Sequence, residues 1–160
     1  MKHLLRLVFI GTIALSFLSP ISSAFADQDF HSQQLPWFLT PEGAAVGHPE
    51  LRSDHVVDVH ANGPQIGAIE RYLINGAKPN TTYEVWLEIF TGSCDGDEVA
   101  FSPLFTRALG TNEQGNAQDG TVFPAEALDG LAGVYGILWT LVDEEGTIAY
   151  ETPCIVVTVD

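Results

Sequence analysis

A chain of 160 residues that sets 21 acidic residues against six Lys and Arg has a formal net charge of −15 at pH 7. This charge disfavours nucleic acid and anionic membrane as partners, because no basic patch is available to displace counterions from phosphate. It favours solubility, attracts cations and basic partners, and would also suit a salty external medium. The length predicts one domain with a core of its own.

The first 26 residues have the pattern of a signal peptide. Lys2, His3 and Arg6 supply a basic start, residues 4–18 are almost wholly apolar, and residues 22–26 end in the small residues that signal peptidase accepts. The apolar run is short for a membrane span, although an uncleaved anchor is the alternative. We therefore expect a secreted or periplasmic protein with no membrane span after signal removal. No cysteine stands at the cleavage position, which disfavours a lipoprotein anchor.

The rest of the chain divides into an extended lead-in over 27–53 and a β-sandwich domain over 54–160. The lead-in contains Pro36, Pro41 and Pro49 and shows no sustained period. Its aromatic pair, Trp37 and Phe38, is expected to pack on the edge or end of the sandwich, with partner binding as the alternative.

Seven strand-like segments follow, separated by turn residues. They cover residues 55–60, 66–75, 83–90, 104–109, 117–123, 133–142 and 148–159, with one short helix over 124–129. The sixth is apolar on both faces and is expected to be central, and Pro153 predicts a bulge or an edge position in the last. Short strands at regular intervals are typical of an antiparallel β-sandwich.

The third predicted strand is the clearest, because a strict two-residue alternation runs from Tyr83 to Phe90. Tyr83, Val85, Leu87 and Ile89 share one face, which we expect to point into the core. The other face carries Glu84, Trp86, Glu88 and Phe90.

Residues 76–85, Gly-Ala-Lys-Pro-Asn-Thr-Thr-Tyr-Glu-Val, resemble the turn-plus-tyrosine entry into a strand of fibronectin type III and related immunoglobulin-like domains. The resemblance implies an immunoglobulin-like sandwich in which Tyr83 packs inward and its hydroxyl bonds back to the turn backbone. It covers about ten residues and implies no activity. In the family this corner lies late in the domain, whereas here it enters the third predicted strand.

Cys94 and Cys154 are the only cysteines, and an exported chain meets an oxidising environment. We expect a disulfide between them. A metal-binding or redox pair would favour the closer C-x-x-C spacing.

Two acidic segments are candidate metal sites. Asp58 and His60 share a strand face, with Asp54, His55 and His48 nearby in sequence, but the usual zinc spacings are absent. The alternative is the polar outer face of an edge strand. The loop with Asp95 and Asp97 has carboxylates suited to calcium but lacks the EF-hand spacing, so a solvated turn is its alternative.

The face formed by Glu84, Trp86, Glu88 and Phe90 is the candidate binding surface. Its aromatic and acidic side chains would suit a sugar, a peptide or a partner protein. Alternatively, the lead-in with Trp37 covers it. Arg71, on the preceding strand, is expected to pair with Glu84 or Glu88.

No catalytic motif occurs: the chain has no Gly-x-Ser-x-Gly, no His-Glu-x-x-His and no phosphate-binding glycine loop. We therefore expect an exported, non-enzymatic β-sandwich module with a binding or structural role at the cell exterior, an unknown protein or glycan partner, and no cofactor. An extracellular metal-binding protein using residues 54–60 is the first alternative. A carbohydrate-degrading accessory enzyme is the second.

Overall fold

Two antiparallel sheets face one another across one core in the computed structural model, which describes residues 30–61, 67–95, 99–128 and 132–159. The predicted all-β sandwich is confirmed, with ten strands in the described residues rather than about seven. The predicted signal peptide lies outside these residues. The strands are β1 (Phe30–Leu35), β2 (Phe38–Leu39), β3 (Ser53–Ala61), β4 (Gly67–Asn75), β5 (Thr82–Thr91), β6 (Val99–Gly110), β7 (Ala117–Phe123), β8 (Gly133–Val142), β9 (Ile148–Glu151) and β10 (Ile155–Val159).

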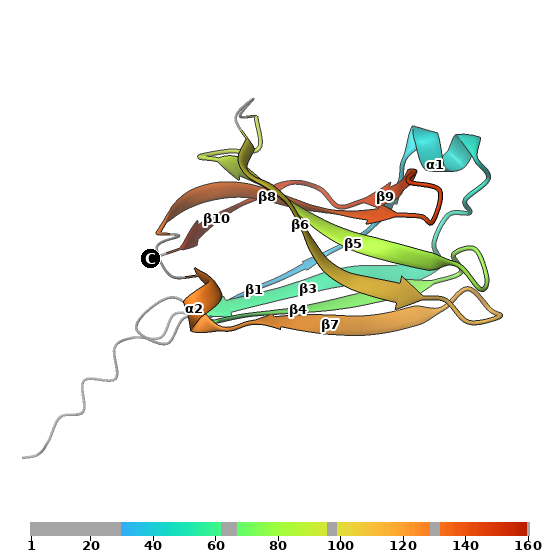
Figure 1. Cartoon of the computed structure of the whole chain (residues 1–160), viewed down its shortest axis with the longest axis horizontal. Helices are drawn as coiled ribbons and strands as arrows, with labels where there is room; N and C mark the ends of the chain where they lie inside the picture. The colour runs from blue at the N-terminus through green and yellow to red at the C-terminus, as the bar shows by residue number, and fades with distance from the viewer. Residues whose placement is uncertain (1–29, 62–66, 96–98, 129–131, 160) are drawn as a thin grey trace, which may run out of the picture.

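The four-stranded sheet has the order β1-β3-β4-β7, and the six-stranded sheet has the order β2-β9-β8-β5-β6, with β10 also paired to β8. Figure 1 shows the two sheets as separate layers, with the short helices α1 (Pro41–Ala45) and α2 (Ala125–Leu128) near opposite ends. The helix predicted over 124–129 is therefore confirmed, and α1 is additional.

The lead-in segment is built into both sheets. β1 pairs with β3 at one edge of the four-stranded sheet, and β2 pairs with β9 at one edge of the six-stranded sheet. The chain therefore crosses between the layers near Pro36. Trp37 follows that crossing and is only 4% exposed, so it is a core residue, whereas Phe38 is exposed. The backbone N–H of Trp37 donates to the Asp54 carboxylate.

β8 is central, as its apolar sequence predicts, because it pairs with β5 on one side and with β9 and β10 on the other. The segment predicted as one last strand is divided at Pro153, which has no N–H to give to the ladder. The break is held by Thr152, whose N–H donates to the Trp139 carbonyl and whose hydroxyl accepts the Trp139 N–H.

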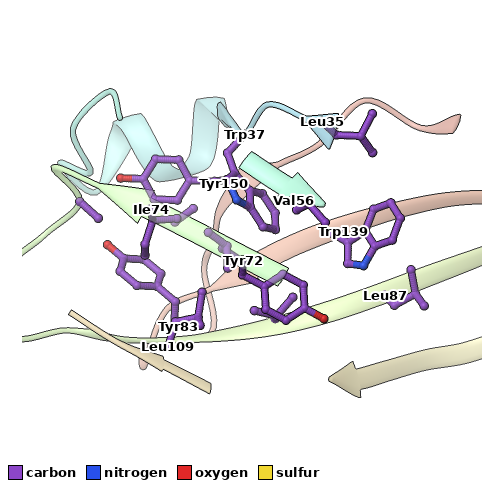
Figure 2. Packing of buried hydrophobic residues seen from close by; sticks show 14 of the residues in the cluster. Leu35, Trp37, Val56, Tyr72, Ile74, Tyr83, Leu87, Leu109, Trp139 and Tyr150 are labelled. Atoms are coloured by element: carbon purple, nitrogen blue, oxygen red, sulfur yellow. The ribbon is translucent and has the colours of Figure 1, made fainter. Parts of the chain in front are cut away.

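The core contains the inward face of β5, as the alternation predicts. Tyr83, Val85 and Leu87 are buried between the sheets, and Ile89 is half-buried against them. Figure 2 shows Tyr83 and Tyr150 toward the end of this core nearest α1, and Trp139 with Leu87 toward the other end. Burial of such large side chains supplies most of the favourable free energy of a domain this size.

The predicted disulfide is confirmed: Cys94 and Cys154 are bonded, with their Cα atoms 5.7 Å apart. Cys94 follows β5 and Cys154 precedes β10, and both strands pair with β8. The bridge therefore joins β5 and β10, which flank β8 on opposite sides, across that strand. Gly136 of β8 makes this possible, since a Cβ there would lie 2.7 Å from the Cys94 nitrogen and 2.6 Å from the Ser93 carbonyl carbon.

Candidate functional site

The outer face of β5 carries the predicted aromatic and acidic side chains. The Trp86 indole N–H donates to Glu84 at 3.0 Å, and its ring meets Phe105 of β6 edge-on with centroids 5.6 Å apart. Burial, and then the nearby Glu151, raise the pKa of Glu88. The structure thus brings together an acidic and aromatic face with Trp86 and Phe90 half-buried.

Two expectations about this face are wrong. The described part of the lead-in, residues 30–53, does not cover it, because Trp37 lies in the core and β9 and β8 separate β2 from β5 in the sheet. Arg71 does not pair with Glu84 or Glu88, because β4 and β5 lie in different sheets. The turn between them crosses from one layer to the other instead of forming a hairpin.

The metal candidates that the structure describes do not form a metal site. Asp58 is only 4% exposed, and β3 has a neighbour on each side, so the alternative of a polar outer face on an edge strand is wrong. Asp95 is exposed in the loop after β5, Asp97 lies outside the described residues, and of His60 only the backbone position in β3 is described. Within the described ranges no three His, Cys, Asp or Glu side chains are grouped to hold a metal ion.

His48 belongs to a buried polar cluster at the α1 end of the sandwich. Its Nε2 lies 2.8 Å from Asp143, and its Nδ1 lies 2.9 Å from the Tyr83 hydroxyl, which accepts the Lys78 N–H at 3.3 Å. The prediction that Tyr83 bonds back to its turn is therefore confirmed. If Nε2 donates to Asp143, the Tyr83 hydroxyl donates to Nδ1 and every group in the chain has a partner.

Asp143 is fixed from several sides. Burial raises its pKa, but the hydrogen bonds from His48 and from the N–H groups of Thr147 and Glu145 outweigh burial, and the net pKa is lowered. Asp, His and Tyr here form a hydrogen-bonded chain of the kind that serves catalysis in open sites. His48 and Tyr83 are buried, so the cluster fixes the 46–52 loop against the sandwich.

A pocket of about 340 Å³ lies between the sheets at the other end, beside α2. Both sheets contribute to it. Its lining is apolar except for Asp58, Glu70 and Tyr135, and otherwise consists of Ala68, Leu87, Ile89, Phe101, Leu104, Phe123, Ala127, Leu128, Ile137, Val157 and Val159. Phe101 and Leu104 of the edge strand β6 are 41% and 44% exposed, so they form its rim. The β5–β6 register is irregular beside them, as it often is next to binding sites.

Two buried carboxyl groups face this pocket from adjacent strands. Asp58 of β3 and Glu70 of β4 are directly opposite in register, and Glu70 is only 2% exposed. Cβ atoms of such a pair lie about 5 Å apart. Burial raises the pKa of Glu70 most, and the charge of Asp58 raises it further, against the lowering effect of Tyr72 and Trp139. The result is a pKa of about 7 for Glu70.

Tyr72 connects this pair to the opposite sheet. Its hydroxyl donates to Glu70 and lies 2.8 Å from the Thr106 hydroxyl of β6, which in turn donates to the Val85 carbonyl. The indole N–H of Trp139 lies near Glu70 without hydrogen-bond geometry and has no other hydrogen-bond partner among the described residues. A fixed donor of this kind favours the ionised carboxylate.

Sequence reasoning missed this pair. One face of β4 carries Ala68, Glu70, Tyr72 and Ile74, and the other carries Ile69, Arg71 and Leu73, so each face mixes apolar and charged residues. The available signal was the acidic residue in an otherwise apolar, aromatic set. The importance of this residue, Glu70, can be recognised only once the pairing of β4 with β3 places it opposite Asp58.

The fold and pocket define an antiparallel β-sandwich with an apolar pocket between its layers. Comparison with protein-family models, curated proteins and solved structures finds no match. None of the helices in the described ranges has the length and apolar character needed to cross a membrane.

Proposed function

We propose that this protein is an exported, non-enzymatic β-sandwich module that binds a small apolar molecule in the pocket between its sheets. The observation that carries the proposal is the pocket itself, about 340 Å³ in volume and lined almost wholly by apolar side chains. Ligand pockets are typically about 300–1,000 Å³, apolar, and supplied with a few polar groups that fix orientation. Protein interiors are otherwise close-packed, with few voids larger than a water molecule.

Export is supported by the signal-peptide pattern of residues 1–26 and by the Cys94–Cys154 disulfide, which suits an oxidising compartment. A binding rather than catalytic role is supported by the absence of a catalytic motif in the sequence and by the burial of the His48 cluster. The location is then secreted or periplasmic.

The test uses residues 27–160 and the neutral dye N-phenyl-1-naphthylamine, whose fluorescence rises in an apolar site. We expect saturable binding of one dye per protein. Val157→Phe fills the pocket and should abolish it, because Val157 is buried in the lining. Val156→Phe is the matched control: the adjacent residue is exposed, lies outside the lining, and should leave dye binding unchanged.

Ala127→Phe provides a second block at the pocket from an exposed position on α2, where the fold should tolerate it. Near-ultraviolet circular dichroism verifies that each variant is folded. Dye binding that is absent from the wild type, or that survives both Val157→Phe and Ala127→Phe, would contradict the proposal.

A further inference from the structure

We infer that the ligand of this pocket carries a neutral carbonyl group, as in a ketone or an ester, whose oxygen accepts a hydrogen bond from the hydroxyl of Tyr135. The inference rests on the proposed binding function and names the chemistry of its ligand. It is carried by the position of Tyr135 in the pocket lining and by its hydroxyl, which forms no hydrogen bond with another described residue.

The other polar side chains of the lining are already engaged. Glu70 accepts a hydrogen bond from the Tyr72 hydroxyl, and Asp58 interacts with other residues as well. Tyr135 differs from both. Its ring contacts Phe101 with the centroids 6.1 Å apart, but its hydroxyl has no hydrogen-bond partner among the described residues. Of the polar groups in the lining, this hydroxyl is therefore the one left for a ligand.

The Tyr135 hydroxyl lies toward the beginning of β8 and is open to small molecules. The side chain leans back along the strand over Gly133, where an added Cβ would lie 3.2 Å from the hydroxyl oxygen. Tyr135 is half-buried, yet its oxygen is not one of the fully buried polar atoms without a partner, which are the indole nitrogens of Trp37 and Trp139. A molecule in the pocket can therefore reach this oxygen.

A carbonyl oxygen is the group that the Tyr135 hydroxyl matches alone. A carbonyl only accepts hydrogen bonds, so one O–H donor satisfies it. An alcohol or an amine brings a further O–H or N–H, which costs free energy in an apolar lining unless it finds an acceptor of its own. An ionised carboxylate also accepts, but its transfer into an apolar lining costs far more, and the net charge of −15 repels it.

The experiment compares butyrophenone, butylbenzene and 4-phenylbutanoate, which share a ring and a carbon skeleton of the same size. Butyrophenone has a carbonyl where butylbenzene has a CH2 group, and 4-phenylbutanoate carries a carboxylate. Displacement of N-phenyl-1-naphthylamine at pH 7 gives each affinity, once the Kd of the dye has been measured for each variant. We expect 4-phenylbutanoate to bind more weakly than butyrophenone.

Tyr135→Phe removes the hydroxyl and keeps the ring. The variant should bind butyrophenone about three- to tenfold more weakly than the wild type and butylbenzene with less than about a twofold change. The infrared carbonyl band of bound butyrophenone should lie at lower frequency in the wild type than in Tyr135→Phe, because the hydrogen bond weakens the C=O bond.

Tyr150→Phe is the matched control. The Tyr150 hydroxyl donates to the Pro49 carbonyl, and the residue lies outside the pocket lining, toward the α1 end of the core (Figure 2). This variant should leave both affinities and the carbonyl band as in the wild type. Near-ultraviolet circular dichroism verifies that both variants are folded. If Tyr135→Phe does not fold, the carbonyl band in the wild type still decides, since it should lie below that of butyrophenone in hexane.

The outcomes separate the two proposals. If Tyr135→Phe binds butyrophenone and butylbenzene as the wild type does, or weakens both equally, the carbonyl inference is overturned and the apolar pocket stays in place. Tighter binding of 4-phenylbutanoate than of butyrophenone would likewise overturn a neutral ligand. If none of the three compounds nor the dye binds, the binding function itself is overturned.

Discussion

The hydroxyl of Tyr83 lies 2.9 Å from Nδ1 of His48, although 35 residues separate them in the chain. The contact joins the turn before β5 to the loop after α1, and through Asp143 it reaches the turn between β8 and β9. Three connections of the sandwich are thus fixed by one hydrogen-bonded chain. Packing between aromatic rings also contributes to this end of the core, since the ring centroids of Tyr83 and Tyr150 lie 5.8 Å apart.

Tyr83→Phe should lower the free energy of unfolding by about 1–3 kcal/mol, because the change leaves the Lys78 N–H and His48 Nδ1 without their buried partner. Urea unfolding followed by circular dichroism measures the loss. Tyr135→Phe is the control: its hydroxyl forms no hydrogen bond with another described residue, and the change should have little effect. Equal losses in the two variants would show that the His48 chain contributes nothing.

Glu70→Gln should change how stability depends on pH. The folded protein holds the proton of Glu70 up to a pKa of about 7, whereas the unfolded chain releases it near 4.5. The contribution of Glu70 is therefore fully present below pH 4.5 and is lost as pH rises through 7, a decrease of at most about 3 kcal/mol relative to the variant. Urea unfolding from pH 4 to 8 measures the difference. A constant difference across this range would mean that Glu70 has an ordinary pKa in the folded protein.

Removal of the disulfide by Cys94→Ser with Cys154→Ser should lower the free energy of unfolding by on the order of 4 kcal/mol. The bridge closes a loop of 60 residues and limits the unfolded chain accordingly. Urea unfolding of the wild type with and without dithiothreitol should reproduce the difference, and the double variant should not respond to dithiothreitol. A wild type that is as stable reduced as oxidised would contradict this expectation.

Trp86 should be the tryptophan most accessible to solvent, because Trp37 and Trp139 are buried in the core. Acrylamide should quench one component of the fluorescence, and Trp86→Phe should remove that component with a stability change below about 1 kcal/mol. Trp37→Phe is the comparison, and it should leave the quenched component intact. If acrylamide still quenches that component in Trp86→Phe, Trp86 is not the solvent-accessible tryptophan and its side chain is covered in the folded protein. The protein or glycan partner expected for this face stays a prediction.

Local patterns predicted the parts of the fold that depend on neighbouring residues. The alternation of β5 indicated that Tyr83 shares a face with Val85 and Leu87, and the resemblance to fibronectin type III domains implied that its hydroxyl bonds back to the turn, as it does to Lys78. The apolar sequence of β8 indicated a central strand, and Pro153 marked the break between β9 and β10. Each of these depends on backbone geometry within a few residues.

The candidate pocket was not predictable in the same way, because it depends on which face of β3 and β4 turns inward. A period of two places Asp58 with Val56 and separates it from Val57, but it does not say which set is buried. The apolar Val57 and Ile69 would suggest the opposite face, yet Asp58 and Glu70 are the buried ones. Which face is buried depends on the packing of the opposite sheet, which local sequence does not reveal. For the same reason local sequence does not reveal that Arg71 and Glu84 lie in different sheets.

The passage of the N-terminal segment from one sheet to the other at Pro36 has a consequence for processing. β1 and β2 occupy the hydrogen-bonding edges of β3 and β9. A protease that trimmed the chain past Leu39 would uncover both of these backbone edges at once, and uncovered edges recruit strands from other copies. The residues of β1 and β2 therefore protect the sandwich against self-association by covering these two edges.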